Sequence, residues 1–443
     1  MAGFVDPPPA LPVLGDSTVL DPTTAGYRDN TAARMRALLS ARVTLLVGIS
    51  VTAIVAWVLY RVTSDLHIDL EVYRAGVLAW WHGGDPYGSL PATRSGAHLP
   101  FIYPPFAALA LGPFVVLPWS AAVAALIATS LVALGGTLYL VARRLWPAGG
   151  TVGALTATSV ALPLALVLEP TFETFRFGQV NIVLMALVAA DCLVVSPRWP
   201  RGLLVGIAAA IKLTPAAFLL FFVLRRDFRA AITAVVSGAV ATVLGFAVAP
   251  AASMRFWFGG MPTSGISGSP FHTNQSIQGT LARLEFPPVL LEACWLVATL
   301  ALVLLAAVLI RRVEATLAVV VNAAVGLLVS PTSWSHHWVW IAPTLLVLTA
   351  YALRLRSIGW ALAAMVLAVV FLVAPHRFLP GGDRRELGWN AAEHLIGNSY
   401  VLVTIVALVV LLGAARARGR CTPTSPATPP TESSRQLTEV GAP

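Results

Sequence analysis

The sequence predicts an all-α, polytopic membrane protein, and three observations support this. Of its 443 residues, 57% are hydrophobic and only 11% are charged. The mean hydropathy is +0.80, and a soluble domain could not cover so much apolar surface. Apolar runs long enough to cross a bilayer also recur along the chain, separated by short segments rich in arginine and proline.

The charge and the cysteines exclude several classes of protein. The formal net charge is +9, but in membrane proteins lysine and arginine collect in cytoplasmic loops. The excess of lysine and arginine therefore indicates how the protein is oriented in the membrane, and we expect no nucleic-acid partner. The three cysteines, Cys192, Cys294 and Cys421, lie far apart, so they predict neither a disulfide framework nor a metal motif.

Composition divides the chain into three parts. Residues 1–33 and 416–443 are rich in proline and polar residues and are predicted to be disordered and cytoplasmic, and residues 34–415 form the transmembrane domain. The first apolar run, Val43 to Tyr60, follows three arginines and precedes no small-residue cleavage site. It predicts a retained first helix whose N-terminus is cytoplasmic.

The basic loops then predict about ten full spans plus two broken or re-entrant hairpins, 10–12 transmembrane helices in all. One hairpin is expected to break at K-L-T-P, from Lys212 to Pro215. Only enough residues for a single span lie between two basic clusters that are both expected in the cytoplasm, so this segment must enter the membrane and return to the same side. The other covers residues 101–118. Extracytoplasmic loops are expected near 65–100, 169–181, 250–289, 330–337 and 375–398.

The polar clusters that could carry chemistry all fall on the predicted outer face. The chain has no glycine-rich phosphate loop after a strand, and neither CxxC nor HExxH. Nucleotide sugars and ATP are scarce outside the cytoplasm, so a lipid-linked donor is expected, with no separate cofactor. The predicted location is the plasma membrane, with both termini cytoplasmic and an extracytoplasmic site.

Six motifs in order resemble the actinobacterial polyprenol-phosphate-mannose-dependent α-(1→2)-mannosyltransferases of glycosyltransferase superfamily C. They are D-L-E-V-Y with G-D-P-Y, then Y-P-P-F, G-Q-V-N, K-L-T-P, N-Q-S with Arg283, and S-W-S-H-H-W. The resemblance implies a glycosyltransferase-C-like fold and an essential aspartate early in the first outer loop. Asp69 matches that aspartate through its D-x-x-V-Y context, although Asp65 and Glu71 lie nearby.

The resemblance also implies a reaction, because the family's donor is a β-linked mannosyl phosphate and its product is α-linked. Inversion at C1 in one displacement needs a base for the acceptor hydroxyl and cationic donors for the departing phosphate. Asp69 is the first choice as base, with His336 or His337 orienting it or taking the proton instead. Adjacent helical residues diverge by about 100°, so one histidine is expected to face the site, and His336 is preferred.

Other side chains are expected to hold the donor and the sugar, and no metal ligand is expected. The candidates are Lys212, Arg283 and Arg176 for phosphate, Gln179, Asn181, Asn274 and Gln275 for sugar hydroxyls, and Tyr103 and Trp334 for stacking.

Structural explanations stay open for each of these residues. Asp69 could cap an interfacial helix, the histidines could belong to an interfacial aromatic belt, Lys212 could snorkel, and Gln179 and Asn181 could satisfy a helix start. Functional alternatives are another lipid-linked transfer, such as arabinosyl transfer, and a transporter or flippase. The acceptor stays open among phosphatidylinositol mannosides, lipomannan or lipoarabinomannan branches and other cell-envelope mannans.

Overall fold

The computed structural model describes residues 22–63, 67–259 and 268–420, with the backbone alone for 22–38 and 417–420. Within these ranges the regular elements are helices, and the β-type pairing is an isolated bridge between Asn274 and Trp334. The all-α prediction is confirmed. The helices are α1 (Pro22–Thr63), α2 (Ile68–Trp81), α3 (Pro105–Leu111), α4 (Pro113–Val116), α5 (Trp119–Leu145), η1 (Pro147–Gly149), α6 (Gly150–Leu166), α7 (Glu169–Phe177), α8 (Asn181–Leu193), α9 (Leu203–Ile211), η2 (Thr214–Phe218), α10 (Leu219–Leu224), α11 (Phe228–Val248), α12 (Pro250–Phe258), α13 (Ile277–Ala282), α14 (Pro288–Arg312), α15 (Ala315–Val329), η3 (Ser335–Trp340), α16 (Ile341–Leu355), α17 (Ile358–Val373), η4 (Pro375–Phe378), η5 (Arg385–Gly388), α18 (Ala391–Gly397) and α19 (Ser399–Arg420).

Eight helices in the described ranges are long and apolar enough to cross a membrane, or nine if the bent pair α7 and α8 is counted as one span. A multi-pass membrane protein is therefore supported, but the count falls short of the predicted ten or so full spans. The shortfall arises because several apolar runs are broken into pieces. Thr214–Leu224 and Ala315–Val329 are apolar but shorter than a full span.

The break predicted at K-L-T-P is present. Helix α9 ends at Ile211, Lys212 adopts an extended backbone, and η2 starts at Thr214 with Pro215 in its first turn. Pro215 has no amide hydrogen and disfavours a helical residue before it, so the helix cannot continue through this point. Residues 101–118 contain the short helices α3 and α4, which meet at Gly112, and neither is long enough to cross a bilayer.

A second break was not predicted. Helices α7 and α8 are bent by 119° at a short break, where Gly178 adopts φ +69° and closes α7. This left-handed backbone is strained for any residue with a Cβ atom. Residues 169–181, expected to be a loop, therefore include a nine-residue helix and a sharp turn.

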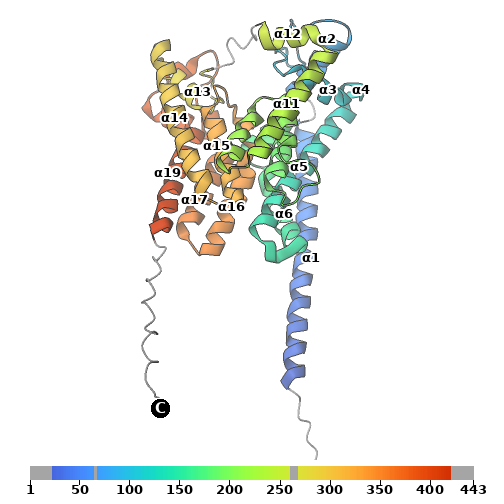
Figure 1. The fold of residues 1–443 in the computed structure, drawn as a ribbon, viewed down its shortest axis with the longest axis vertical. Helices are drawn as coiled ribbons and strands as arrows, with labels where there is room; N and C mark the ends of the chain where they lie inside the picture. Colours follow the sequence, from blue (N-terminus) through green and yellow to red (C-terminus); the bar gives the residue numbers. More distant parts are fainter. Residues whose placement is uncertain (1–21, 64–66, 260–267, 421–443) are drawn as a thin grey trace, which may run out of the picture.

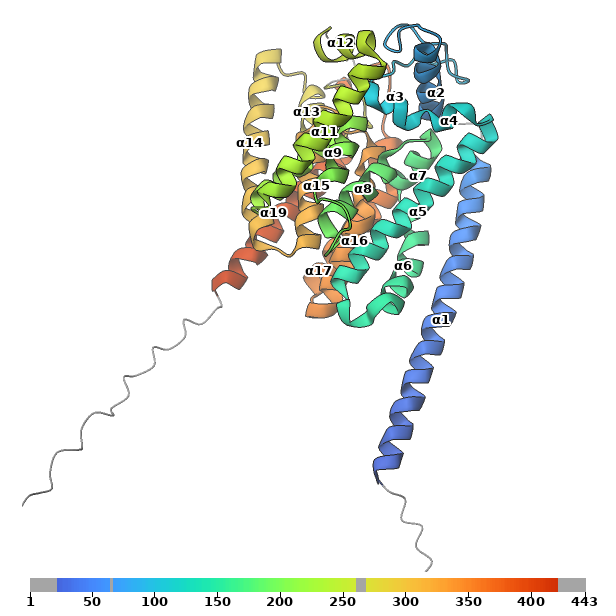
Figure 2. The same ribbon diagram turned by 45° about the vertical axis from the view of Figure 1, so that its right-hand side comes forward.

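Two ends of the molecule can be distinguished (Figure 1, Figure 2). Helices α2, α3, α4 and α12 gather at one end, and the start of α1 and the end of α19 extend from the other. The backbone boundaries also differ from expectation, since α1 begins at Pro22 and α19 continues to Arg420. The rest of both predicted tails, 1–21 and 421–443, lies outside the described residues, as do Asp65 and residues 260–267 of a predicted loop.

Candidate active site

Asp69 lies in the first turn of α2 and is partly buried. The N-cap residue is His67, and no side chain caps the helix, so the helix-cap explanation for Asp69 receives no support. Burial raises the pKa of Asp69 to about 7, although the charge of Lys212 and a hydrogen bond with Gln179 act to lower it. A carboxyl group poised near neutral pH can take or release a proton under ordinary conditions.

Lys212 brings together residues from four other motifs. Its Nζ donates to Oδ1 of Asn181 at 2.9 Å and lies 3.3 Å from Nε2 of His337. It also lies 5.6 Å from the centre of the Tyr103 ring and interacts electrostatically with Asp69. The extended backbone at the break directs Lys212 into this cluster, so the structure does not support the explanation that Lys212 snorkels to a distant interface.

Two tyrosines and a glutamine form the wall beside Asp69. The hydroxyl of Tyr73 donates to Oε1 of Gln179 at 2.7 Å and lies 3.0 Å from the hydroxyl of Tyr103. Nε2 of Gln179 donates to the Tyr103 hydroxyl at 3.1 Å. All three side chains are buried. The sequence pointed to Tyr103 and Gln179, and Tyr73 was missed although it is the tyrosine of the D-L-E-V-Y motif itself.

The two histidines have different surroundings. His337 contacts Lys212 and is half-buried. His336 is 8% exposed, and its ring packs edge-on against Phe177 at 5.1 Å between centroids. The backbone carbonyl of His336 accepts from Thr174 at 2.8 Å and from Asn181 at 3.0 Å. The structure thus directs one histidine toward the cluster, as expected, but it is His337 and not the preferred His336.

Four of the expected ligand-binding residues lie in a separate structure built on residues 268–284. Arg283 is 1% exposed, and its guanidinium donates to Asn398 and to the carbonyls of Pro270, Phe271 and Asn274. These contacts occupy its donors, so we do not include Arg283 as a phosphate ligand.

The side-chain amide donors of Asn274 and Gln275, in the N-Q-S motif, are occupied in the same way. Asn274 donates to the carbonyl of Ser269 at 2.8 Å and accepts from the amide of Ser333 at 3.0 Å. Gln275 donates to the carbonyls of His272 and Gly397. Trp334 pairs with Asn274 through the isolated bridge. Asn274 and Gln275 are fully buried, so in this structure they tie the 268–284 segment to its neighbours and do not face a ligand.

A buried charged network behind η3 was not predicted. Oε1 of Glu169 accepts from Ser335 at 2.7 Å and from Arg377 at 3.3 Å, and Oε2 accepts from Tyr400 at 3.0 Å. Arg377 also pairs with Glu173. We name Glu169, Glu173, Ser335, Arg377 and Tyr400 the Glu169 network.

Arg176, the third expected phosphate ligand, pairs with Glu173 at 3.0 Å. This contact attaches Arg176 to the edge of the Glu169 network. We therefore leave it out of the proposed phosphate site.

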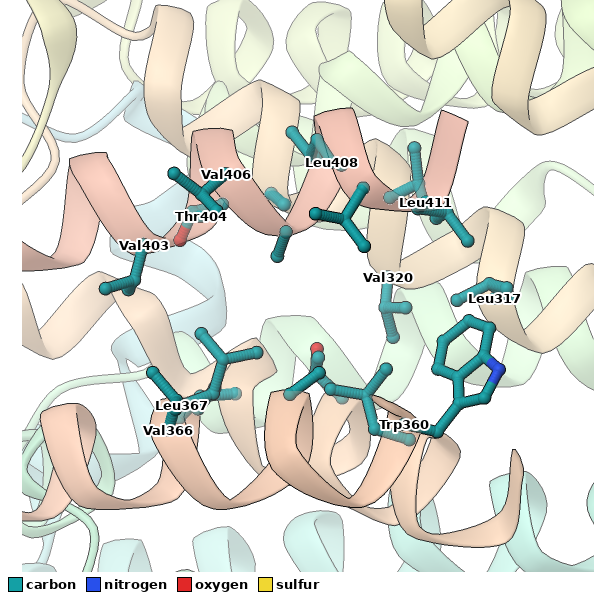
Figure 3. A pocket seen from close by; sticks show the side chains of 18 of the residues that line it. Leu317, Val320, Trp360, Val366, Leu367, Val403, Thr404, Val406, Leu408 and Leu411 are labelled. Atoms are coloured by element: carbon teal, nitrogen blue, oxygen red, sulfur yellow. The ribbon is translucent and has the colours of Figure 1, made fainter. Parts of the chain in front are cut away.

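Two cavities lie within the helical bundle. A cavity of about 480 Å³ is lined by Asn181 and His337 and extends along α8, η2 and α15. A second groove, of about 620 Å³, lies between α17 and α19 against α15 and is lined mainly by apolar side chains such as Val366, Leu367 and Val406 (Figure 3). Neither Asp69 nor Lys212 lines either of these two cavities.

The all-α bundle, its several helices long and apolar enough to cross a membrane, and the electrostatic interaction of a partly buried carboxyl group with a lysine define a multi-pass membrane protein with a candidate active site for acid–base chemistry. The family model "Glycosyltransferase family 87" matches residues 101–331. The chain belongs to this glycosyltransferase family, and the resemblance predicted from its motifs is confirmed.

Curated relatives cover most of the chain. A protein of Mycobacterium tuberculosis (strain ATCC 25618 / H37Rv), named polyprenol-phosphate-mannose-dependent alpha-(1-2)-phosphatidylinositol mannoside mannosyltransferase, is 39% identical over 383 residues, 83% of this chain and 88% of its own. A pentamannoside mannosyltransferase of Mycobacterium tuberculosis (strain CDC 1551 / Oshkosh) is 34% identical over 333 residues, 71% and 75% of the two chains.

Among solved structures, ArnT from Cupriavidus metallidurans bound to undecaprenyl phosphate aligns with 84% of this chain and 78% of its own. The TM-score is 0.33 and the identity is 16%. Similarity at this level does not establish a shared fold, and the glycosyltransferase-C-like architecture stays a prediction.

Proposed function

We propose that this protein transfers mannose from a polyprenyl-phosphate-mannose donor to a mannose 2-hydroxyl of a cell-envelope glycolipid, with inversion at C1. The observation that carries the proposal is the electrostatic interaction of Asp69 with Lys212 beside a wall of tyrosine and amide side chains. A base beside a phosphate-binding cation is what this displacement requires. The names of the relatives supply the donor and favour mannose over arabinose.

In the proposed mechanism, Asp69 takes the proton of the acceptor hydroxyl as its oxygen attacks C1 of the donor mannose. The bond between C1 and the phosphate oxygen breaks, and its electron pair leaves with the polyprenyl phosphate. Lys212 stabilises the negative charge that collects on that phosphate. Asn181 and His337 hold the Lys212 ammonium in place, and Gln179 orients Asp69. No covalent intermediate on the protein is required.

The acceptor is proposed to be a phosphatidylinositol mannoside, the class that both relatives' names give. The site is proposed to face the extracytoplasmic side. Basic residues support this orientation, because Arg143 and Arg144 end α5 and Arg311 and Arg312 end α14. Both helix ends lie at the end of the molecule where α19 finishes (Figure 2), opposite α2, as expected for a cytoplasmic face rich in arginine.

The test is mannosyl transfer in membranes containing the wild-type protein or Asp69→Asn at matched abundance. The donor is polyprenyl-phosphate mannose and the acceptor a phosphatidylinositol mannoside. Asp69→Asn keeps the shape of the side chain but cannot accept the proton, so we expect the rate to fall at least about a hundredfold. Equal rates would exclude Asp69 as base. A wild-type protein that transfers no mannose to any mannoside would overturn the proposed function.

A further inference from the structure

The G-D-P-Y motif, residues 84–87, takes no part in the mechanism above, and its contacts indicate another role. Its last three residues and the following Gly88 are the types preferred in a tight turn. The turn is closed by a hydrogen bond from the amide of Gly88 to the carbonyl of Asp85 at 3.1 Å. Oδ1 of Asp85 also accepts from the amide of Tyr87 at 2.9 Å. The turn therefore sets the position of Tyr87.

Tyr87 joins this turn to the wall beside Asp69. Its hydroxyl donates to the carbonyl of Tyr103 at 2.8 Å, and its buried ring packs against Phe101 at 5.9 Å between centroids. The two residues after Tyr103 are prolines, which have no amide hydrogen to donate. A side-chain donor therefore helps to fix the backbone of Tyr103, and Tyr87 supplies that donor.

Arg255 on α12 holds the same turn from its other side. The guanidinium forms an ion pair with Oδ2 of Asp85 and donates to the carbonyl of Tyr87 at 3.4 Å. Phe256, the next residue of α12, packs against the Tyr87 ring at 5.6 Å between centroids. Helix α12 lies with α2 and α3 at one end of the molecule (Figure 1). A chain of contacts thus runs from α12 through the turn to Tyr103.

Tyr103 extends this chain of contacts to the residues around Asp69. Its hydroxyl lies 3.0 Å from the hydroxyl of Tyr73 and accepts from Nε2 of Gln179 at 3.1 Å. Its ring centre lies 5.6 Å from Nζ of Lys212. Gln179 is also the residue that hydrogen-bonds with Asp69. A shift of Tyr103 would therefore change how the Gln179 amide is oriented toward the base.

We propose that Arg255 is a positioning residue for the transfer, which acts through Asp85 and Tyr87 to hold Tyr103 in the wall beside Asp69. The inference rests on the proposed function, because this wall serves the base of that reaction. The side chains of the Arg255–Asp85 pair are 49% and 37% exposed, and exposed ion pairs contribute little to stability. A small misplacement near the reacting groups, in contrast, can cost about a hundredfold in rate.

A phosphate of a lipid substrate is the alternative partner for a half-exposed arginine on the predicted outer face. Arg255 already contacts the carboxylate of Asp85 and the carbonyl of Tyr87, which favours the positioning role. The two roles also differ in kinetics. Loss of a phosphate ligand raises the KM for the lipid that carries the phosphate, whereas loss of positioning lowers kcat.

The experiment compares Arg255→Met and Tyr87→Phe with Arg94→Met in the full-length protein. Arg94 is the matched control, because its side chain is 53% exposed and pairs with Glu71 at 3.4 Å. We expect Arg255→Met and Tyr87→Phe each to lower kcat per folded molecule about tenfold, with the KM for donor and acceptor unchanged. Arg94→Met should match the wild type, and Arg255→Lys, which keeps the charge, should recover most of the rate.

The double variant Arg255→Met/Tyr87→Phe tests whether the two residues act along one chain of contacts. If they do, the second substitution breaks a connection that is already lost, so the double variant should lose no more than about tenfold in kcat. Two residues that act independently would give a loss of about a hundredfold, the product of the single losses.

An infrared titration of the Asp69 carboxyl group reports on the wall without requiring transfer. Its band is identified by its loss in Asp69→Asn. The hydrogen bond with Gln179 acts to lower the pKa of Asp69, so a misoriented Gln179 should raise the titration midpoint in Arg255→Met and Tyr87→Phe. Arg94→Met should titrate like the wild type. The charged or titratable groups that interact with Asp69, Lys212, Tyr73 and Tyr103, are retained in all three variants.

Three results would overturn the inference. One is a raised KM at constant kcat in Arg255→Met, which would make Arg255 a substrate ligand. The second is a multiplied loss in the double variant, and the third is a wild-type titration midpoint for Asp69 in both Arg255→Met and Tyr87→Phe. The proposed function fails separately, if the wild-type protein transfers no mannose, and the infrared titration tests the chain of contacts in that case too.

Discussion

Nε2 of His337 lies 3.3 Å from Nζ of Lys212. A charged lysine has three donors and no acceptor, so this contact requires a lone pair on Nε2 and places the proton of a neutral imidazole on Nδ1. The lone pair that His337 would need as a base is thus engaged by Lys212. The geometry makes His337 a partner of the cation and leaves Asp69 as the proton acceptor.

His337→Gln is therefore expected to be less harmful than Asp69→Asn. Glutamine can still offer an oxygen to Lys212, whereas asparagine at position 69 cannot take a proton. We expect His337→Gln to retain at least about ten times the kcat/KM of Asp69→Asn, because general-base removal costs about a hundredfold or more. Steady-state mannosyl transfer by the two variants checks this. A larger loss in His337→Gln than in Asp69→Asn would assign the base to His337.

The rate should rise with pH through about 7. Burial raises the pKa of Asp69 from 3.8 to about 7, while Lys212 and Gln179 act to lower it, and the base must be deprotonated to work. Plots of kcat/KM against pH should show this acidic limb in the wild type, with Asp69→Glu as a variant that keeps a titrating carboxyl group. A kcat/KM that stays constant between about pH 5 and 8 would contradict the assignment of Asp69 as the base.

The same shift affects stability. A raised folded-state pKa means that the folded protein prefers protonated Asp69, so this contribution is present below the ordinary value of 3.8 and is lost as pH rises through about 7. Asp69→Asn should remove that dependence. Thermal unfolding in detergent at several pH values, for wild type and Asp69→Asn, measures the difference. Parallel curves for the two proteins would show that Asp69 is not buried as described.

Lys212→Met should abolish most of the activity. The departing phosphate would lose its cation, and Asn181 would lose its 2.9 Å hydrogen bond from Nζ. Removing one such electrostatic partner typically costs about a hundredfold to a thousandfold in kcat. Lys212→Arg keeps the charge and serves as the control, although its planar group differs in reach. A Lys212→Met variant at wild-type rate would remove Lys212 from the mechanism.

The Glu169 network is expected to position the histidine segment. Ser335 precedes His336 and donates to Glu169 at 2.7 Å, while Thr174 and Asn181 hold the carbonyl of His336. Ser335→Ala should lower kcat about tenfold to a hundredfold, the scale of a small misplacement near the chemistry. The KM for donor should stay nearly constant, and Ser335→Thr should restore the rate.

A purely structural role for the network gives a different result. In that case Ser335→Ala would lower the amount of folded protein and its melting temperature, but kcat per folded molecule would be unchanged. Active-site titration with a labelled donor, combined with thermal unfolding, distinguishes the positioning role of the Glu169 network from a purely structural role.

Arg283→Met should act on stability. Its guanidinium is almost fully buried and holds Asn398 and three backbone carbonyls. Removing it leaves those acceptors unpaired, which costs on the order of 3 kcal/mol. We expect a lower melting temperature and an unchanged donor KM for the protein that stays folded. A raised donor KM at wild-type stability would restore Arg283 as a phosphate ligand.

The sequence predicted the residues around Lys212 because short motifs carry them. Polar side chains between apolar spans are costly and therefore stand out in the sequence. Such clusters contain Asp69, Tyr103, Gln179 and Asn181. The structure brings all of them to Lys212 or to its neighbours. The orientation of the histidines could not be predicted, because η3 is a 3-10 segment with a non-helical Trp338 and not a regular helix.

The Glu169 network left no comparable signal. Glu169 and Tyr400 are separated by 231 residues, and no motif in the sequence indicates that these two residues are in contact. The predicted number of spans is not confirmed, for a related reason. Hydropathy measures how apolar a run is, but not where the helix within it ends, and Ala315–Val329 is apolar but shorter than a full span.

The shortness of α9 has a consequence for the medium in which the sugar reacts. Nine helical residues rise about 14 Å, less than half of the hydrocarbon thickness of a bilayer, so a helix of this length ends at Lys212 before reaching the far surface. Tyr73, Tyr103 and Gln179, joined by their own hydrogen bonds, then take the place of bulk water around the ions. The protein supplies a fixed solvation shell, whose dipoles need not reorganise when the phosphate departs.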